Sequence, residues 1–482
     1  MSRLPVVRRL SLRHRESTRL TAKDAALRTR LCEADQGHVF RFYDDLSAEQ
    51  RTTLLAQLRS IDLALVKKLI DRHLAVETEP HTPKLAPAEV IPLAADAAGR
   101  AEAAASRKVG EEALRAGRLA VLVVAGGQAT RLGYDAPKGC FPIGPVSGKS
   151  LFQVHAEKVL ALSRRYGRAV PLLLLVSPDN HGPTRRFFEQ HSYFGLPAAD
   201  VTFFEQGMLP ALDRDGRLLL AERGRIFLSP DGHGGVYRAA VRSGAVAALR
   251  KRGVDTLFYF QVDNPLVSVG DPVFIGHHLR QESEFSLKVV AKRDAAEKVG
   301  VFAQLDGRPG IVEYSDLSAE LREARSPEGR LVYGAGSIAI HAFSLAFFER
   351  LGQGALELPY HFARKKVPYI DEAGDLVNPA EPNGVKFESF VFDGLALARR
   401  TMAMEVARDE EFAPVKNRTG EDSPESCRQA WSALHRRWLA AAGLRLRADA
   451  VAEVGPLLAL DAEELAAKVA AGTIGRAWFD HA

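Results

Sequence analysis

Short, unbroken apolar runs are the feature that most limits how this chain can fold. They are Leu119–Ala125, Pro171–Val176 and Thr256–Val262, and each is only six or seven residues long. Runs of this length are typical of strands that are buried on both faces of a parallel sheet. Helical stretches such as Leu151–Arg165 lie between them. Strands that alternate with helices predict a doubly wound α/β sheet in the centre of the chain.

The flanking regions read as helical, and 482 residues are too many for one compact core. Ser47 and Gln50 have the spacing of a helix capping box, and Asp461 with Glu464 predicts another helix start near the C-terminus. Prolines 80, 83 and 87 suggest a linker. We therefore expect a helical N-terminal region with a basic arm (1–110), a catalytic α/β domain (111–395) and a small C-terminal domain (396–482).

Composition excludes several classes of protein. The net charge is only +5, without the clustered basic stripe that nucleic-acid binding requires. No apolar run is long enough to span a bilayer, and residues 1–19 lack the apolar segment of a secretory signal. The three cysteines are far apart and form no CxxC pair, which argues against disulfides and structural zinc. We expect a cytoplasmic protein, a monomer or homodimer, that binds neither nucleic acid nor membrane.

A glycine-rich loop follows the first apolar run. Gly126 and Gly127 would let the backbone approach phosphates and offer N–H donors to them, while Arg131 and Lys138 add positive charge. The spacing does not match the G-x-G-x-x-G of dinucleotide-binding folds, and the GPVSGKS of 144–150 is one residue short of a Walker loop. Taken alone, the loop is also compatible with a plain strand-to-helix turn.

Several further blocks appear in a recognisable order along the chain. They include FFEQHSYFGL (187–196), FFEQGMLPAL (203–212), SPDGHGGVYR (229–238), QVDNP (261–265), IVEYS (311–315), PNGVKFESFVFD (382–393) and FAPVKN (412–417). Together with 119–138, they resemble the eukaryotic-type UDP-sugar pyrophosphorylases, over roughly residues 25–445. The nearest branch is that of the UDP-N-acetylglucosamine pyrophosphorylases. The resemblance implies a Rossmann-like (GT-A type) nucleotidyltransferase core with a mixed, mainly parallel sheet.

The reaction of that family joins UTP to a sugar 1-phosphate and yields a UDP-sugar and pyrophosphate. The second pKa of a phosphate monoester is about 6, so the sugar phosphate is mostly a dianion at pH 7 and needs no general base. Catalysis should therefore depend on positioning and on neutralising phosphate charge. The resemblance assigns the nucleotide to Gly126, Gly127, Gln206 and Gly232, the phosphate charge to Arg131, Lys138 and Lys416, and Mg²⁺ to Asp263.

The same resemblance assigns the sugar to His233, Gly300, Glu313 and Ser337. His233 and Ser337 stand where the N-acetylglucosamine branch has Asn, so glucose 1-phosphate or a broad set of sugars is the alternative to N-acetylglucosamine 1-phosphate. Ala129 replaces a glycine of the loop, and alanine resists a positive φ by roughly 1 kcal/mol. A nucleotide-sugar-binding protein with weak turnover is a third hypothesis, against which Arg131, Lys138, Asp263 and Lys416 argue.

Overall fold

The computed structural model describes residues 21–73 and 83–473. Contacts within the chain divide it into two compact units. Among the described residues, the small unit consists of 21–73, 208–231 and 360–388, and the large unit of 83–207, 232–359 and 389–473. The predicted basic arm, at residues 1–19, lies outside the described residues.

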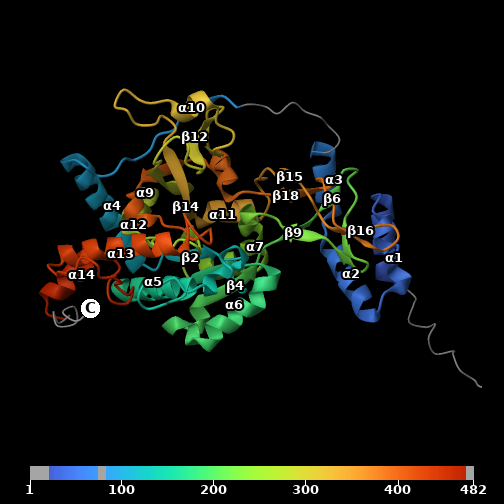
Figure 1. Cartoon of the computed structure of the whole chain (residues 1–482), viewed down its shortest axis with the longest axis horizontal. Coiled ribbons are helices and arrows are strands. Elements are labelled where there is room, and N and C mark those ends of the chain that lie inside the picture. The colour runs from blue at the N-terminus through green and yellow to red at the C-terminus, as the bar shows by residue number, and fades with distance from the viewer. Residues whose placement is uncertain (1–20, 74–82, 474–482) are drawn as a thin grey trace, which may run out of the picture. The chain divides into compact units, whose positions relative to one another are not determined.

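A ten-stranded mixed sheet organises the large unit (Figure 1). Its main path has the order β1-β12-β14-β10-β2-β3-β4, with β13 beside β12, β11 beside β14, and β19 beside β11. The strands are β1 (Leu85–Pro87), β2 (Leu119–Val124), β3 (Leu172–Val176), β4 (Val201–Glu205), β10 (Thr256–Gln261), β11 (Phe285–Ala291), β12 (Val301–Leu305), β13 (Arg308–Val312), β14 (Ala335–Ser344) and β19 (Thr401–Glu405). Neighbours from β10 to β4 are parallel, whereas β14 runs antiparallel to β10, β11 and β12.

Both faces of this sheet are covered, as the apolar runs predict. Leu119, Val121 and Val123 of β2 belong to one hydrophobic core, and Ala120 and Leu122 belong to the core on the opposite face. Side chains alternate between the faces of a strand, so a continuous apolar run satisfies both cores at once. The predicted strands are confirmed as β2, β3 and β10, and the α/β class is confirmed with them.

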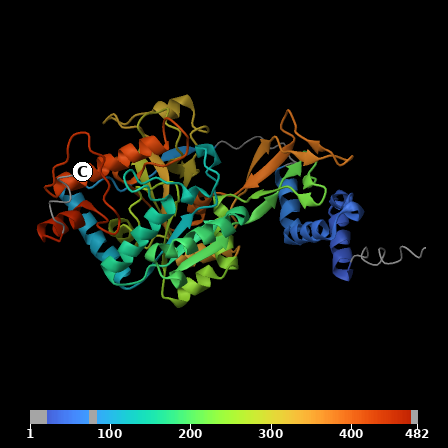
Figure 2. The ribbon, with the colours of Figure 1, turned by 60° about the horizontal axis from the view of Figure 1, so that its bottom comes forward.

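Helices surround the sheet of the large unit (Figures 1 and 2). They are α4 (Ala97–Arg115), α5 (Leu151–Tyr166), α6 (Pro178–Gln190), α7 (Val236–Arg242), α8 (Ala245–Lys251), α9 (Pro272–Arg280), α10 (Ala319–Glu323), α11 (Leu345–Gly352), α12 (Arg408–Glu411), α13 (Pro424–Ala441) and α14 (Ala462–Ala470). The predicted start of α14 is confirmed, since the Asp461 side chain accepts from the Glu464 N–H. Ser150, the last residue of the Walker-like stretch, caps α5 in the same way through the Gln153 N–H.

The small unit combines helices with short strands from three separate segments of the chain. Its helices are α1 (Ala22–Glu33), α2 (Ala48–Ser60) and α3 (Leu63–His73). Its strands are β5 (Met208–Pro210), β6 (Leu212–Asp213), β7 (Leu220–Glu222), β8 (Arg225–Ile226), β9 (Leu228–Pro230), β15 (His361–Lys365), β16 (Tyr369–Ile370), β17 (Leu376–Val377) and β18 (Gly384–Glu388). The capping box of Ser47 and Gln50 is confirmed at the start of α2.

The two units do not follow the predicted domain boundaries. Residues 208–231 and 360–388, which the sequence places in the central domain, pack with the N-terminal helices because Leu212, Val385 and Phe387 share a core with Leu54 and Leu58. The main sheet also extends past residue 395, since β19 pairs in parallel with β11. The division into three domains stays a prediction. No helix in the described part of the chain has the length and hydrophobicity needed to cross a bilayer.

Buried histidines predict how stability depends on pH. Burial lowers the pKa of His155, His341 and His435 to about 3 and that of His278 to about 4, from an ordinary 6.5. The unfolded chain therefore binds more protons as the pH falls below 6.5, and folding free energy present above that pH is lost toward pH 4. We expect the free energy of unfolding, measured with urea, to be lower at pH 5.5 than at pH 7.5. The difference should be up to about 1.4 kcal/mol per histidine and pH unit.

Two substitutions make this measurement specific. Replacing the buried His278 with Gln should flatten the pH dependence, while replacing the exposed His191 with Gln should leave it unchanged. Equal unfolding free energies at pH 5.5 and 7.5 in the unsubstituted protein would contradict the prediction.

Candidate active site

The glycine-rich loop begins directly after β2. A Cβ on Gly126 would lie 2.8 Å from Oε1 of Gln206 and 3.3 Å from the Ser177 nitrogen, so a side chain here would crowd both neighbours. Gln206 follows β4 and is only 9% exposed. Gly127 has open space where a Cβ would be. The structure therefore brings Gly126 and Gln206 into contact and leaves Gly127 accessible to a ligand.

Ala129 does not strain the loop. Its φ is −92° and its ψ is 17°, so the cost of a positive φ, expected from the sequence, does not arise. Its methyl group is buried in the core below the loop, and its N–H donates to the Ala136 carbonyl at 3.1 Å. Arg131 lies in the short 3₁₀ turn that follows (Thr130–Leu132) and is exposed.

An ion pair connects the loop to the end of β10. The Lys138 ammonium lies 2.8 Å from Oδ2 of Asp263, and both side chains are mostly buried. The Lys138 backbone N–H donates to the Gly127 carbonyl at 3.0 Å. Lys138 thus links Gly127 with Asp263, two positions more than 130 residues apart in the chain.

Lys416 reaches the same region from the C-terminal part of the chain. The Val415 N–H donates to the Asp263 carbonyl at 2.9 Å. Asn264 holds the preceding residues, since its Nδ2 donates to the Glu411 carbonyl at 2.7 Å and its Oδ1 accepts from the Ala413 N–H at 3.1 Å. Lys416 itself is 47% exposed and lies 3.3 Å from Asp422. This segment crosses the end of β10 and brings Lys416 next to Asp263.

A cavity of about 190 Å³ collects six of the predicted site residues. These are His233, Asp263, Gly300, Glu313, Ser337 and Lys416. The Ser337 N–H donates to the Gly300 carbonyl at 2.8 Å, and a Cβ on Gly300 would lie 2.7 Å from the Ile311 side chain. Every residue predicted to contact the sugar therefore lines the same cavity as the predicted metal ligand.

The hydrogen bonding of His233 fixes its tautomer. The Val391 N–H donates to Nδ1 of the ring at 3.0 Å, and the ring stacks on Phe390. A neutral imidazole that accepts at Nδ1 carries its proton on Nε2. Gly232, just before it, has a φ of 83°, a conformation that glycine adopts without strain.

His341 also lines this cavity and was missed by the sequence analysis. It is almost fully buried, and its Nδ1 lacks a hydrogen-bond partner among the described residues. A β-bulge in β14 precedes it, where Ala339 has a φ of 55°. Bulges are frequent next to active sites because they redirect side chains. The mostly apolar sequence of residues 337–343, SIAIHAF, does not by itself predict such a bulge.

Asn180, in the first turn of α6, is a second residue that the sequence did not reveal. Its Nδ2 donates to the carbonyls of Gly126 at 2.8 Å and Gly127 at 3.1 Å, and its Oδ1 accepts from the Gln128 side chain. The amide is completely buried. Sequence spacing alone could not associate a residue of α6 with the loop.

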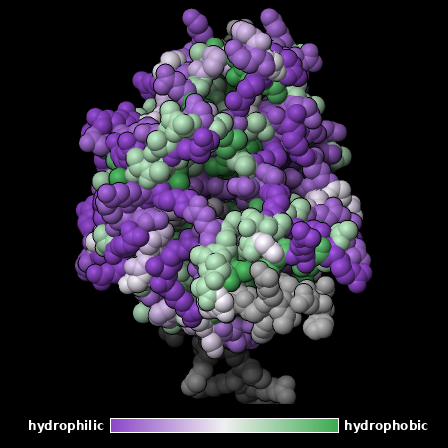
Figure 3. Space-filling model, turned by 90° about the vertical axis from the view of Figure 1, so that its left-hand side faces the viewer, coloured by the Kyte–Doolittle hydropathy of each residue, from purple (hydrophilic) through white to green (hydrophobic). Residues whose placement is uncertain are grey.

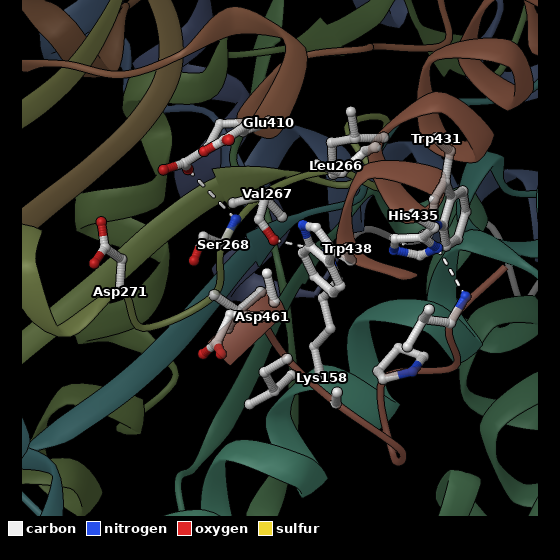
Figure 4. Close-up of a pocket in the computed structure, with 18 of the residues that line it drawn as sticks. Lys158, Leu266, Val267, Ser268, Asp271, Glu410, Trp431, His435, Trp438 and Asp461 are labelled. Carbon is white, nitrogen blue, oxygen red and sulfur yellow. Dashed lines mark hydrogen bonds between the residues drawn. The ribbon is translucent and has the colours of Figure 1, made fainter. Parts of the chain in front are cut away.

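A larger cavity of about 520 Å³ lies between the loop that follows β10 and the helices α13 and α14 (Figure 4). Lys158 extends into this region and donates to the carbonyls of Pro265 at 2.5 Å and Val267 at 2.7 Å, and burial lowers its pKa to about 7. None of the buried side-chain nitrogens and oxygens that line it lacks a partner in the described chain. Its polar groups are satisfied without a ligand, so we do not assign the active site to it.

The surface near these helices is mixed in character. The face that α14 presents carries hydrophobic patches separated by hydrophilic side chains (Figure 3). The exposed residues Val146, Val451 and Leu457 contribute apolar surface in this part of the large unit. Glu453 lies among them and accepts from the N–H groups of Val146 and Ser147, both at 2.8 Å. Two backbone N–H groups of the Walker-like stretch therefore bind the carboxylate of Glu453.

Asp263 has the chemistry of a magnesium ligand that shares the ion with substrate. Mg²⁺ is usually held by one or two carboxylates together with phosphate oxygens and water. Lys138 occupies Oδ2 of Asp263, which leaves Oδ1 to coordinate an ion. Groups of three or more His, Cys, Asp or Glu suited to a metal do not occur within residues 21–73 and 83–473. A single carboxylate at Asp263 is compatible with an ion whose other ligands are phosphate oxygens and water.

Comparisons with known proteins identify relatives along almost the whole chain. The "UDP-N-acetylhexosamine pyrophosphorylase-like protein 1" of Xenopus tropicalis is 40% identical over 433 residues, covering 86% of this chain and 84% of that protein. The "UDP-N-acetylglucosamine pyrophosphorylase" of Saccharomyces cerevisiae is 36% identical over 451 residues, 90% of this chain and 94% of that one. The crystal structure of the uridine diphosphate N-acetylglucosamine pyrophosphorylase from Trypanosoma brucei, in complex with an inhibitor, is 29% identical and covers 94% of this chain and 96% of that chain, with a TM-score of 0.79.

A family model described as UTP–glucose-1-phosphate uridylyltransferase matches residues 67–435, most of the chain. Because that match covers most of the chain, and because relatives above 30% identity are matched over 84% and 94% of their length, the chain belongs to the UTP–glucose-1-phosphate uridylyltransferase family.

Proposed function

We propose that this protein is a uridylyltransferase that converts UTP and N-acetylglucosamine 1-phosphate to UDP-N-acetylglucosamine and pyrophosphate. The observation that carries the proposal is that Asp263, which pairs with Lys138, lines one cavity together with Lys416 and the predicted sugar residues. The names of the relatives from Xenopus tropicalis and Saccharomyces cerevisiae support the acetylated sugar.

In this mechanism a phosphate oxygen of the sugar 1-phosphate attacks the α-phosphorus of UTP. The bond from that phosphorus to the oxygen bridging to the β-phosphate breaks, and the electron pair leaves with pyrophosphate. The attacking group is already an anion at pH 7, so no side chain must remove a proton. The work of the protein is to hold two polyanions in line and to neutralise their charge.

The side chains of the site divide this work. Gly127 and the neighbouring backbone accommodate the triphosphate, and the Gln206 amide offers the donor and acceptor that a uracil edge requires. Arg131, Lys138 and Lys416 supply positive charge. Asp263 would hold Mg²⁺, which neutralises phosphate charge when bound. These roles agree with the contacts of Gly126 with Gln206 and of Lys138 with Asp263.

Glucose 1-phosphate is the second candidate substrate, and two features favour it. The matching family is described by that sugar phosphate, and His233 stands where the N-acetylglucosamine branch has Asn. A neutral His233 ring that accepts at Nδ1 carries its proton on Nε2, and the residue lines the cavity. The names of the relatives favour the acetylated sugar, so we expect a preference for N-acetylglucosamine 1-phosphate that does not exclude glucose 1-phosphate.

The sugar preference can be measured directly. With UTP and Mg²⁺, kcat/KM from pyrophosphate release should be higher for N-acetylglucosamine 1-phosphate than for glucose 1-phosphate. Ser337→Asn should raise this ratio by roughly ten-fold, because a longer amide can pair with the acetamido group and each unmet polar atom costs about 1–3 kcal/mol. A ratio that strongly favours glucose 1-phosphate would overturn the proposed sugar, and equal rates with ATP or CTP would overturn the role of Gln206.

Turnover is expected to require a divalent metal held by Asp263. Asp263→Asn keeps the size of the side chain but removes its charge, and should lower kcat by at least about 100-fold. Excess chelator should abolish activity in the unsubstituted protein, and Mg²⁺ should restore it. Full activity in the presence of chelator, or in the folded Asp263→Asn protein, would rule out this role.

Lys416 is expected to act on phosphate charge and not on sugar identity. Lys416→Ala should lower kcat about 100-fold for every accepted sugar phosphate, since a donor aimed at developing charge is worth about that factor. Lys298→Ala is the matched control, because Lys298 lines the same cavity without a proposed role. A loss confined to one sugar, or an equal loss in both variants, would contradict the assignment.

A further inference from the structure

The peptide units of the glycine loop are held in one orientation. The carbonyl of Gly126 accepts from Asn180 at 2.8 Å, and the carbonyl of Gly127 accepts from Asn180 at 3.1 Å and from the Lys138 N–H at 3.0 Å. Both carbonyls therefore point toward the start of α6. In a planar trans peptide the N–H points opposite to the C=O. The N–H groups of Gly127 and Gln128 consequently point away from Asn180.

These two N–H groups are available to a ligand. The structure gives neither of them a hydrogen-bond acceptor among the described residues. A side chain on Gly127 would meet nothing within 4 Å, so the loop faces open space there. Successive backbone N–H groups that point the same way form a concave anion site. Phosphate oxygens are the anions that the proposed reaction brings to this loop.

Both polar atoms of the Asn180 side chain take part in holding the glycine loop. The side-chain nitrogen must face the two carbonyls, because only a donor can satisfy them, and Oδ1 then accepts from the Gln128 side chain. The Ser177 side chain caps the helix by accepting from the Asn180 N–H, which fixes the backbone of this residue as well. Asn180 is completely buried and cannot touch a substrate itself.

We propose that Asn180 is a positioning residue, which orients the glycine loop so that the N–H groups of Gly127 and Gln128 face the phosphates of the nucleotide. This inference rests on the proposed function, because it takes UTP as the ligand. Asn180 acts through the loop and not through the nucleobase or the sugar. Replacing Asn180 should therefore weaken the binding of UTP, which carries phosphates, more than the binding of uridine, which carries none.

The test compares Asn180→Asp with a matched control on the same helix. In Asn180→Asp a carboxylate of equal size faces two carbonyl oxygens and repels them, so the peptide units should turn. Thr184→Val is the control, since Thr184 lies one turn further along α6, is equally buried, and its hydroxyl lacks a partner in the described chain. Asn180→Ala, which removes the clamp without adding charge, is the second variant.

Dissociation constants for UTP and uridine are measured by titration for each protein, together with KM for both substrates. We expect Asn180→Asp to weaken UTP binding by at least about ten-fold, which corresponds to 1.4 kcal/mol, and to change uridine binding less than about two-fold. The KM for UTP should rise while the KM for the sugar 1-phosphate stays near that of Thr184→Val. Asn180→Ala should show the same pattern with a smaller change.

The outcomes separate this inference from the proposed function. Unchanged UTP binding in Asn180→Asp and Asn180→Ala would overturn it, and so would an equal loss of UTP and uridine binding, which would indicate a general structural role. In both cases the unsubstituted protein would still bind UTP and release pyrophosphate. Failure of the unsubstituted protein to bind UTP would instead overturn the proposed function, and the inference with it.

Discussion

A buried ammonium group holds the C-terminal part of the site in place. Lys288 on β11 is fully buried and lies 2.7 Å from Asp271 and 2.5 Å from Glu411. Burial alone would lower the pKa of Lys288, but the two carboxylates raise it, and Lys288 in turn lowers the pKa of Asp271. Removing one member of such a cluster leaves an uncompensated buried charge, which is strongly destabilising. Glu411 is therefore fixed, and the segment from 412 to 416 begins from a fixed point beside Asn264 and Asp263.

The register of the parallel strands brings the other residues level with this segment. Gln261 pairs with Val124, Val124 pairs with Leu175, and Leu175 pairs with Phe204 across β10, β2, β3 and β4. Every one of these strands ends within one residue of that row. The segments that follow these strands therefore place polar side chains and exposed backbone groups at the same edge of the sheet. Ligands of open α/β sheets bind at this carboxyl edge.

The sequence predicted those parts of the fold and site that depend on local pattern. Leu119–Ala125 was identifiable as a strand because both faces are apolar, and Ser47 and Asp461 were identifiable as caps because capping depends on residues three apart. The small unit could not be predicted, because its core joins Leu54 with Leu212 and Phe387, which only the folded chain brings together. Asn180 and His341 could not be predicted as site residues for the same reason, since the residues they contact lie on other elements.

The strain expected at Ala129 was wrong for a related reason. A glycine at that position in relatives suggests a positive φ, but the residue has a φ of −92° here and buries its methyl group. Within the loop the positive φ lies at Gly133, and elsewhere in the site it lies at Gly232 and Ala339, the last of which is not a glycine. Backbone conformation depends on what each residue packs against, and a block of similar residues does not specify it.

The change of strand direction between β10 and β14 divides the site in two. On the parallel side, the ends of β2, β3 and β4 carry Gly126, Gly127, Asn180 and Gln206, which surround the proposed nucleotide site. On the antiparallel side, β12, β13 and β14 carry or adjoin Gly300, Glu313, Ser337 and His341, which line the cavity proposed to bind the sugar. β10 belongs to both halves, since it pairs in parallel with β2 and antiparallel with β14. Asp263 follows β10 directly, so the one acidic group proposed to hold a cation lies at the junction where the two substrates must join.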